Sequence, residues 1–465
     1  MPPKRTIGWE TVSGNQDRVS DGTADRQHQE SRAPGTMMLK HPTMEIWPQY
    51  PIVILGLWLI ASPFTFGYES LAMTISDTVS GVLLIVFSGA VILLGSGIAN
   101  YVNGFVGVWL LLAPLFFWAP TSDAYLNDTL VGVFVITFAV LVVMRMEMSG
   151  PDIPRGWTYN PSTAAQRAPI IIAGLIGFFF STHMATFQLG YTDFVFDPFF
   201  GRGTENVLTS DVSRMFPISD AGLGAVAYAV EVLMGFMGDK RRWRTMPWMV
   251  TLFGIVVIPL GFVSIVLIIL QPLAVGTWCT LCLLSALAML FMIALTVDEV
   301  AAMGQFLYQQ TRGDVSLWHV FWMGGSFSTS DAGVDGKTRS DADSWWSMFW
   351  GMSVSRPLLG TTGLGLWLIS SPALLGTVGA AADSSHLVGA LVVTFSVIAM
   401  GEPVRTVRFL NIPLGIWVIV APWVLTGSSI VAMWSSVAVG ILIVVFSVPR
   451  GSIRDQYGSW NRYIR

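Results

Sequence analysis

Charged residues and cysteines are both scarce in this 465-residue sequence. Asp, Glu, Lys and Arg make up 12% of the chain, hydrophobic residues make up 53%, and mean hydropathy is +0.62. Soluble domains carry about twice that charged fraction, so the composition excludes a soluble enzyme. The chain has only two cysteines, and no histidine lies near them. A structural zinc site needs four such ligands, so the cysteine pair is not expected to hold a metal.

Long apolar segments are abundant instead. A membrane-spanning helix needs about 20 predominantly apolar residues. Segments of that kind form three blocks of four, near 49–66, 77–98, 103–119 and 127–146, then 168–190, 218–238, 247–270 and 276–297, then 357–376, 384–400, 409–425 and 429–448. We therefore predict an all-α polytopic membrane protein of about twelve spans.

The positive charges indicate the orientation. If the N-terminus is cytoplasmic and the spans alternate, all 25 Lys and Arg residues fall inside except Arg202 and Arg214. This agrees with the positive-inside rule. It predicts a bacterial cytoplasmic-membrane protein with both termini inside and the cysteines at the outer face. The basic cluster 240–244 is then a cytoplasmic anchor of the topology, and no nucleic-acid partner is expected.

An internal repeat occupies the first and last blocks. Gly-x-Trp followed by Pro occurs four times, with the prolines at 63, 114, 372 and 422, and each copy is followed by a second span near Gly81, Gly132, Gly389 or Gly440. The pattern resembles the SPW-repeat family of bacterial membrane proteins, which implies membrane helices. A scaffold and a ligand site between helices are both compatible with it.

The repeats suggest a domain organisation. Repeats 1 and 2 are expected at 47–147, and repeats 3 and 4 at 357–448. The remaining segments are interpreted as a disordered cytoplasmic tail (1–46), a linker (148–167), a Trp-rich interfacial linker (298–356) and a basic cytoplasmic tail (449–465). The segment 168–297 forms a separate four-span unit.

The two cysteines, Cys279 and Cys282, open the last span of that unit. Residues three apart share one face of a helix. The free N–H groups and partial positive charge of a helix N-terminus favour a thiolate. The pair is therefore a candidate catalytic redox centre. A structural disulfide and two inert thiols are the alternatives, whereas a thioredoxin motif would need a strand–helix setting.

The four-span unit resembles the vitamin K epoxide reductase family. The likeness rests on the layout of the spans, on Val207–Ser210 and Trp278–Leu283, and on the flanking motifs Gly150–Pro154 and Asp197–Gly201, which look like the bacterial subgroup that fuses this domain between SPW repeats. The resemblance implies a four-helix quinone reductase. By it, Cys282 faces the quinone, menaquinone or ubiquinone, and Cys279 exchanges with a protein partner.

The same resemblance implies further quinone-site residues. Asp220 takes the place of the family's polar quinone contact, in register with Tyr228, and Ser210 matches a loop serine. Asp220 is equally well read as the N-cap of a helix starting at 221, and Ser210 as an ordinary loop hydroxyl.

The chain also departs from the family. Thr204 stands where most members have a loop cysteine, and the loop 191–217 has no cysteine at all. Thiol–disulfide exchange would then require a separate molecule, such as an extracytoplasmic thioredoxin-like protein. The other expected partners are membrane lipid and a membrane quinone.

One ionisable residue, Glu231, lies deep within a span. Intramembrane acids are costly unless they are paired. Glu231 is a possible proton relay, or an acid that faces the bundle and is held by a hydroxyl. Two functions follow for the whole chain: a thiol–disulfide oxidoreductase coupled to a quinone, or a non-enzymatic structural or partner-binding protein. A transporter is disfavoured because the spans have so few polar residues.

Overall fold

All regular structure in the described part of the chain is helical. The computed structural model describes residues 46–141, 151–311, 316–325 and 345–464. Outside the helices, the regular pairings found there are two isolated bridges, Trp157 with Tyr457 and Met352 with Gly401. The all-α prediction is confirmed. The expected tail 1–46 lies almost entirely outside the described residues.

The count of about twelve spans is also confirmed. Within the described residues, eleven helices are long and apolar enough to cross a membrane. A twelfth span is obtained if the bent pair Gly203–Met215 and Asp220–Phe236, which meet at 88°, is counted as one. The second predicted span of the middle block, 218–238, is therefore the one whose helix, at 17 residues, is too short to be counted by itself.

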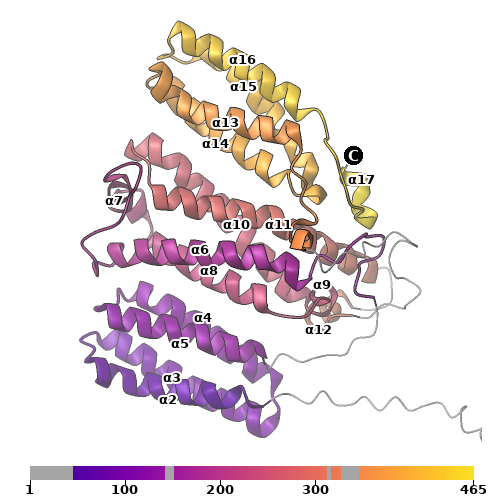
Figure 1. Cartoon of the computed structure of the whole chain (residues 1–465). Helices are drawn as coiled ribbons and strands as arrows, with labels where there is room; N and C mark the ends of the chain where they lie inside the picture. The colour runs from indigo at the N-terminus through magenta and orange to yellow at the C-terminus, as the bar shows by residue number, and fades with distance from the viewer. Residues whose placement is uncertain (1–45, 142–150, 312–315, 326–344, 465) are drawn as a thin grey trace, which may run out of the picture. The chain divides into compact units, whose positions relative to one another are not determined.

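The first block contains α2 (Gln49–Phe66), α3 (Leu71–Leu94), α4 (Gly97–Phe116) and α5 (Ser122–Leu141) (Figure 1). α3 and α4 each begin six residues before the expected apolar segment. The reason is local, because Ser70 and Ser96 are N-caps whose side chains accept hydrogen bonds from the backbone N–H groups of Met73 and Ala99.

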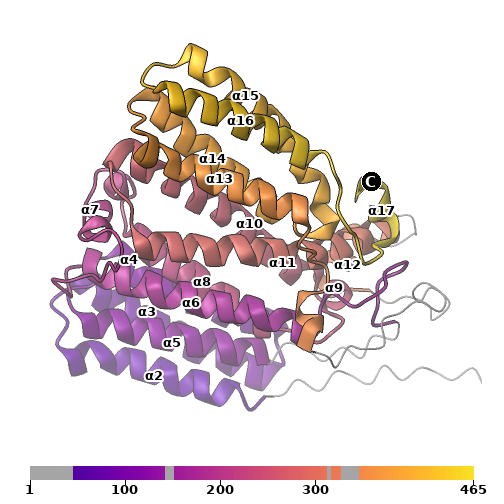
Figure 2. The ribbon, with the colours of Figure 1, turned by 45° about the horizontal axis from the view of Figure 1, so that its top comes forward.

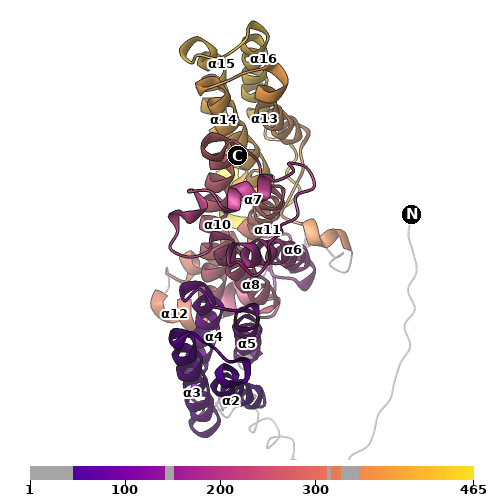
Figure 3. The ribbon, with the colours of Figure 1, turned by 90° about the vertical axis from the view of Figure 1, so that its left-hand side faces the viewer.

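The middle block is a bundle of α6 (Ala164–Gln188), α8 (Asp220–Phe236), α10 (Pro247–Leu270) and α11 (Thr280–Gln310) (Figure 2). Its core is apolar and includes Phe253, Val257, Met292 and Ile293, each at most 1% exposed. Short elements connect the four helices: α7 (Gly203–Leu208), η2 (Ser213–Met215), α9 (Arg242–Thr245) and η3 (Gln271–Val275). α7 lies across the ends of α10 and α11 (Figure 3).

The last block contains α13 (Arg356–Leu375), α14 (Ala380–Ile398), α15 (Asn411–Val424) and α16 (Ile430–Ser447). The remaining elements are α12 (Leu317–Met323), η5 (Trp345–Phe349), η6 (Glu402–Leu410), η7 (Gly458–Trp460) and α17 (Asn461–Ile464). In the Trp-rich segment, the described residues Trp318, Trp345 and Trp346 are more than half exposed.

Glycine pairs bring the two helices of each repeat together. A Cβ on Gly56 would lie 2.8 Å from the carbonyl oxygen of Gly81, and one on Gly81 would lie 2.5 Å from that of Gly56. The equivalent glycines of the other three repeats, at 107 and 132, 365 and 389, and 415 and 440, show the same reciprocal approach. The absence of a side chain at these glycines thus allows the two helix backbones to approach closely.

The repeat tryptophans join the two repeats of a pair. Trp58 in repeat 1 donates a hydrogen bond to Asn127 in repeat 2 at 2.7 Å, and Trp109 in repeat 2 donates to Ser76 in repeat 1 at 3.1 Å. In the C-terminal pair, Trp367 donates to Ser435 and Trp417 to Ser384 in the same reciprocal way. Hydrogen bonds between the two repeats therefore hold each pair together as a four-helix unit.

Buried polar contacts gather around the C-terminal half of α11. Arg242 is wholly buried and forms a bidentate ion pair with Glu299, with nitrogen–oxygen distances of 2.6 and 2.5 Å. Arg244 is also wholly buried. The basic cluster 240–244 is thus partly packed inside the protein, and its role as a cytoplasmic anchor of the topology stays a prediction. The expected C-terminal tail is likewise packed, since Tyr457 is wholly buried and donates to Glu402 at 2.8 Å.

Candidate active site

The two cysteines form a disulfide at the start of α11. Cys279 is the N-cap residue of this helix, and its sulfur accepts a hydrogen bond from the N–H of Cys282 at 3.0 Å. The predicted position of the pair, in the first turn of a long apolar helix, is confirmed.

The two sulfurs differ in exposure. Cys279 is 0% exposed, whereas Cys282 is partly exposed. The sulfur of Met184 in α6 lies 4.0 Å from Sγ of Cys279 and 3.6 Å from Sγ of Cys282. Since a disulfide carries no S–H, these are packing contacts. The apolar cluster around the pair also includes Val195, Leu208, Ala221 and Leu281.

The chain entering the disulfide is held by a buried amide. Gln271 is 3% exposed, and its side-chain oxygen accepts a hydrogen bond from the backbone N–H of Cys279 at 3.0 Å. Gly276, with a φ of 76°, reverses the chain between these two residues. The sequence argument missed Gln271, although a polar residue at the end of an apolar span is a usable signal.

Asp197 connects the outer loop to the disulfide segment. One carboxylate oxygen accepts from the backbone N–H of Thr204 at 2.8 Å and from its hydroxyl at 2.6 Å. The other accepts from the N–H of Phe200 at 2.9 Å and from the hydroxyl of Thr280, the residue directly after Cys279. Partial burial raises the pKa of Asp197, but these hydrogen bonds outweigh it and hold the pKa well below its usual range.

The loop packs tightly against the same segment. Thr204, which the family resemblance predicts at the position of a loop cysteine, is wholly buried and donates to Asp197. A Cβ on Gly203 would lie 2.1 Å from the carbonyl oxygen of Trp278. Loop side chains on the other side face outward, with Phe194, Phe196 and Phe199 all more than half exposed. The loop therefore covers Cys279.

The structure places Asp220 and Ser210 in one polar network. Ser213 links them: its hydroxyl donates to Asp220 at 2.9 Å, and its N–H donates to the hydroxyl of Ser210 at 3.4 Å. Gln188, the last residue of α6, also donates to Asp220, at 2.6 Å. Neither Ser213 nor Gln188 was anticipated.

The interpretation of Asp220 as an N-cap is wrong. Helix α8 begins at Asp220 itself, and its N-cap is Ser219, whose hydroxyl accepts from the N–H of Gly222 at 2.9 Å. A hydroxyl one residue earlier already satisfies the free N–H group. Asp220 is therefore available to the network around Gln188.

Tyr228 lies deeper in the bundle and bridges three helices. It is 3% exposed, and its hydroxyl donates to the carbonyl oxygen of Ser285 at 2.6 Å. A Cβ on Gly177 of α6 would lie 2.4 Å from its ring. Ser285 follows Cys282 by one helical turn, so Tyr228 approaches the helix just below the disulfide.

Glu231 lies one turn beyond Tyr228 and is 0% exposed. Neither of its carboxyl oxygens has a hydrogen-bond partner in the described part of the chain. The alternative prediction, that a neighbouring hydroxyl holds the Glu231 carboxyl, is therefore wrong as far as the described residues are concerned. Among the same residues, no group of three or more His, Cys, Asp or Glu side chains is placed to hold a metal ion.

Comparison with known families decides the domain architecture. Residues 168–297 match the model of the vitamin K epoxide reductase family, and residues 46–142 and 359–449 match that of the SPW repeat domain. The chain is a vitamin K epoxide reductase family domain flanked by SPW repeat domains. The predicted resemblance is confirmed. Neither the curated proteins nor the solved structures contain a match to this chain.

The reductase domain and its SPW neighbours are in direct contact. Trp278, which precedes Cys279, meets His386 of repeat 3 edge to face with ring centroids 5.6 Å apart. On the other side, Leu111 and Ile136 of repeat 2 pack with Ala229 of the reductase domain. The SPW helices therefore support both flanks of the reductase bundle.

Proposed function

We propose that the protein is a membrane thiol–disulfide oxidoreductase that couples the Cys279–Cys282 pair to reduction of a membrane quinone. The observation that carries the proposal is the disulfide at the mouth of α11 in a reductase-family domain. In the forward step, the reduced dithiol loses two electrons and two protons and becomes the disulfide. The quinone accepts both electrons and both protons and becomes the quinol.

The partial exposure of Cys282 supports its assignment as the thiol that reacts with the quinone. We assign the quinone contact to Asp220, Ser210 and Tyr228. Ala221, the residue after Asp220, belongs to the apolar cluster around the two cysteines, so the Asp220 network lies beside the disulfide. A hydroxyl or carboxyl at this place can hold a proton for a quinone oxygen. Glu231, buried and without a hydrogen-bond partner among the described residues, is the proposed proton relay from the interior of the bundle.

Regeneration of the dithiol requires a separate reductant. We propose a thioredoxin-like protein outside a bacterial cytoplasmic membrane, with both termini of the chain in the cytoplasm. Because Cys279 is wholly buried under the loop, such a partner reaches it only after the loop 191–217 has moved. Release of the hydrogen bond between Asp197 and Thr280 is part of that movement.

Quinone turnover by the purified full-length protein tests the proposal. With dithiothreitol as reductant and a soluble menaquinone or ubiquinone analogue, the wild type should form quinol. Cys282→Ala and Cys279→Ala should each abolish turnover, whereas Leu287→Ala, at a 60% exposed position on the same helix, should preserve it. Absence of quinol formation by the folded wild type would overturn the proposal.

The burial of Cys279 also favours a second candidate function. A disulfide shielded by a loop without cysteines suits a non-enzymatic membrane scaffold in which the bond only stabilises the bundle. In that case, the two Cys→Ala variants should lower the melting temperature, and the wild type should turn over no quinone with any dithiol reductant.

A further inference from the structure

Two aspartates occupy equivalent positions in SPW repeats 1 and 2. Asp77 lies in α3 four residues before Gly81, and Asp128 lies in α5 four residues before Gly132. Both residues are 0% exposed. Their carboxyl groups come from different repeats and lie within hydrogen-bonding reach of each other. The pair therefore sits where the two repeats meet.

Each carboxyl group retains a buried oxygen without a partner. Asp77 accepts a weak hydrogen bond from Ser62 at 3.4 Å through Oδ2, and Asp128 accepts one from Asn127 at 3.3 Å through Oδ1. Oδ1 of Asp77 and Oδ2 of Asp128 have no hydrogen-bond partner among the described residues. Two buried oxygens that accept from nothing else indicate a missing donor.

No basic side chain in the described part of the chain compensates the pair. The sequence from residue 46 to residue 141 contains no Lys, Arg or His, and α8, which packs on α4 and α5, contains none either. Within the described residues, Tyr68 faces both carboxyls, and its hydroxyl lies within hydrogen-bonding reach of Asp77. The nearby acids Glu69 and Asp123 are exposed, and the tyrosines of α2 and α4, Tyr50 and Tyr101, lie in the first two turns of those helices.

Two touching carboxylates in an apolar core repel each other and lose their hydration. One proton removes one of the two charges and supplies the donor that the unpartnered oxygens lack. We propose that Asp77 and Asp128 form a proton-binding site that holds one shared proton between SPW repeats 1 and 2. The proton comes from water, and the pair then carries a single negative charge.

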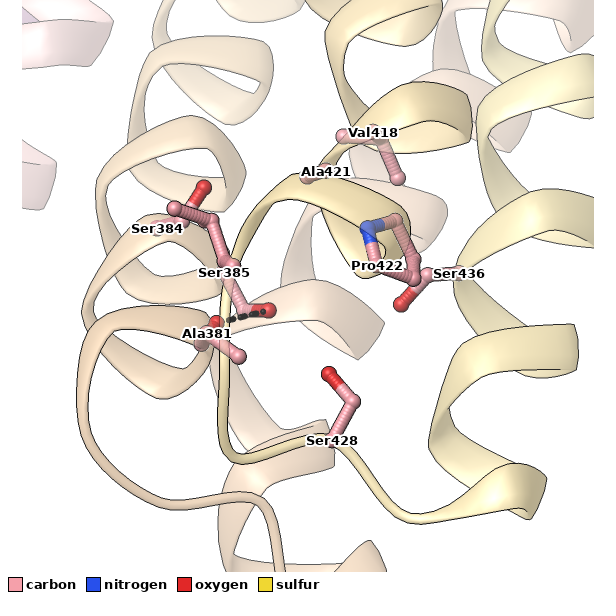
Figure 4. A pocket seen from close by; sticks show the side chains of 9 residues that line it. Ala381, Ser384, Ser385, Val418, Ala421, Pro422, Ser428 and Ser436 are labelled. Carbon is pink, nitrogen blue, oxygen red and sulfur yellow. Dashed lines mark hydrogen bonds between the residues drawn. The ribbon is translucent and has the colours of Figure 1, made fainter.

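The C-terminal SPW pair offers a natural comparison. Ser385 and Ser436 take the places of the two aspartates, each four residues before the repeat glycine. These serines, from α14 and α16, line a small pocket together with residues of α14, α15 and the segment that follows α15 (Figure 4). With hydroxyls in place of carboxyls, this pair needs no proton. The proposed site therefore belongs to the N-terminal pair alone.

Infrared spectroscopy of the full-length protein tests the site. Aspartate labelled with ¹³C at the side-chain carboxyl separates these groups from glutamate such as Glu231. The wild-type spectrum minus that of an Asp77→Asn, Asp128→Asn double variant should contain the C=O stretch of one protonated carboxylic acid and the bands of one carboxylate. Asp123→Asn changes an exposed residue of α5, the helix that carries Asp128, and should leave the protonated band unchanged.

A second variant guards against misfolding of the first. Asp77→Ser combined with Asp128→Ser copies the C-terminal pair, keeps a hydroxyl at each position, and should remove the same protonated band. If either difference spectrum lacks a protonated band, both carboxyls are ionised and a bound cation must balance them, which overturns the proposal. A protonated band whose area corresponds to two carboxylic acids would overturn the proposal as well.

Discussion

The carboxylate of Asp197 accepts a hydrogen bond from the hydroxyl of Thr280, the residue that directly follows Cys279. The two residues are 83 positions apart in the sequence. The same carboxylate accepts from Thr204 and Phe200, so the outer loop and the disulfide segment share one anion as their anchor. The loop and the disulfide are therefore expected to respond together to mutation.

Replacement of Asp197 should loosen the loop over the disulfide. Asp197→Asn keeps the shape of the side chain but removes the charge that strengthens the six hydrogen bonds this carboxylate accepts. We expect a loss of about 1–3 kcal/mol of stability and faster reduction of the disulfide by dithiothreitol. Chemical denaturation and thiol trapping measure these two effects. Asp193→Asn, an exposed acid in the same loop, should change neither.

The anchor should also weaken in acid. The pKa of Asp197 is held below its usual range in the folded protein, so its stabilising contribution is complete above the ordinary carboxyl range. It should decrease as the pH falls through that range toward the lower folded pKa. Melting curves from neutral pH down to pH 3 should show a smaller acid-induced loss for Asp197→Asn than for the wild type. Parallel curves would contradict this role.

A methyl group at position 203 should push the loop away from the disulfide segment. Its Cβ would lie 2.1 Å from the carbonyl oxygen of Trp278, which is backbone and cannot rotate aside. We expect Gly203→Ala to cost about 1–3 kcal/mol and to expose Cys279 to reductants. Gly104→Ala is the matched control, because its Cβ would meet nothing within 4 Å. Equal reduction rates in both variants would argue against a covering role of the loop.

The reduced cysteines should differ in reactivity. A membrane-impermeant maleimide added outside should label Cys282 before Cys279, since Cys279 is 0% exposed and Cys282 is partly exposed. Single Cys→Ser variants followed by mass spectrometry assign each rate. Labelling of either thiol only after lysis would overturn the proposed orientation, and preferential labelling of Cys279 would contradict the loop geometry.

The buried ion pair between Arg242 and Glu299 should be more important for stability than a surface pair. Glu299→Gln leaves a buried guanidinium without its counter-ion and should cost about 3–5 kcal/mol. Arg202→Ala disrupts the exposed pair with Glu205 and should leave the melting temperature nearly unchanged. Thermal unfolding of the two variants in the same detergent compares them. Equal decreases in melting temperature would mean that the buried pair contributes no more to stability than the exposed one.

Much of the architecture was predictable because it depends on local pattern. Apolar segments of bilayer length identify spans, and the repeated Gly-x-Trp and Pro positions identify the SPW units. The spacing of Cys279 and Cys282 predicted their place in the first helical turn. The extent of α11 was not predictable in this way, because Asp298 and Glu299 interrupt the apolar run, and contacts such as that of Glu299 with Arg242 hold this part of the helix.

The candidate site was only partly predictable for the same reason. Asp220 and Ser210 were singled out by family register, but Gln188 and Ser213, which join them, belong to a helix end and a 3-10 turn without a motif. Asp197 stood within a flanking motif, yet its bond to Thr280 spans 83 residues. No local spacing encodes such a pairing.

The sequence by itself therefore determined the membrane class, the repeats and the position of the dithiol, because hydropathy and short-range spacing act within one helix. Only the tertiary structure decided that Cys279 is buried, that Asp197 anchors the loop above it, and that Asp77 meets Asp128 between two repeats. Those properties arise when helices distant in sequence pack together, and packing decides which polar groups lose water and which partners they find.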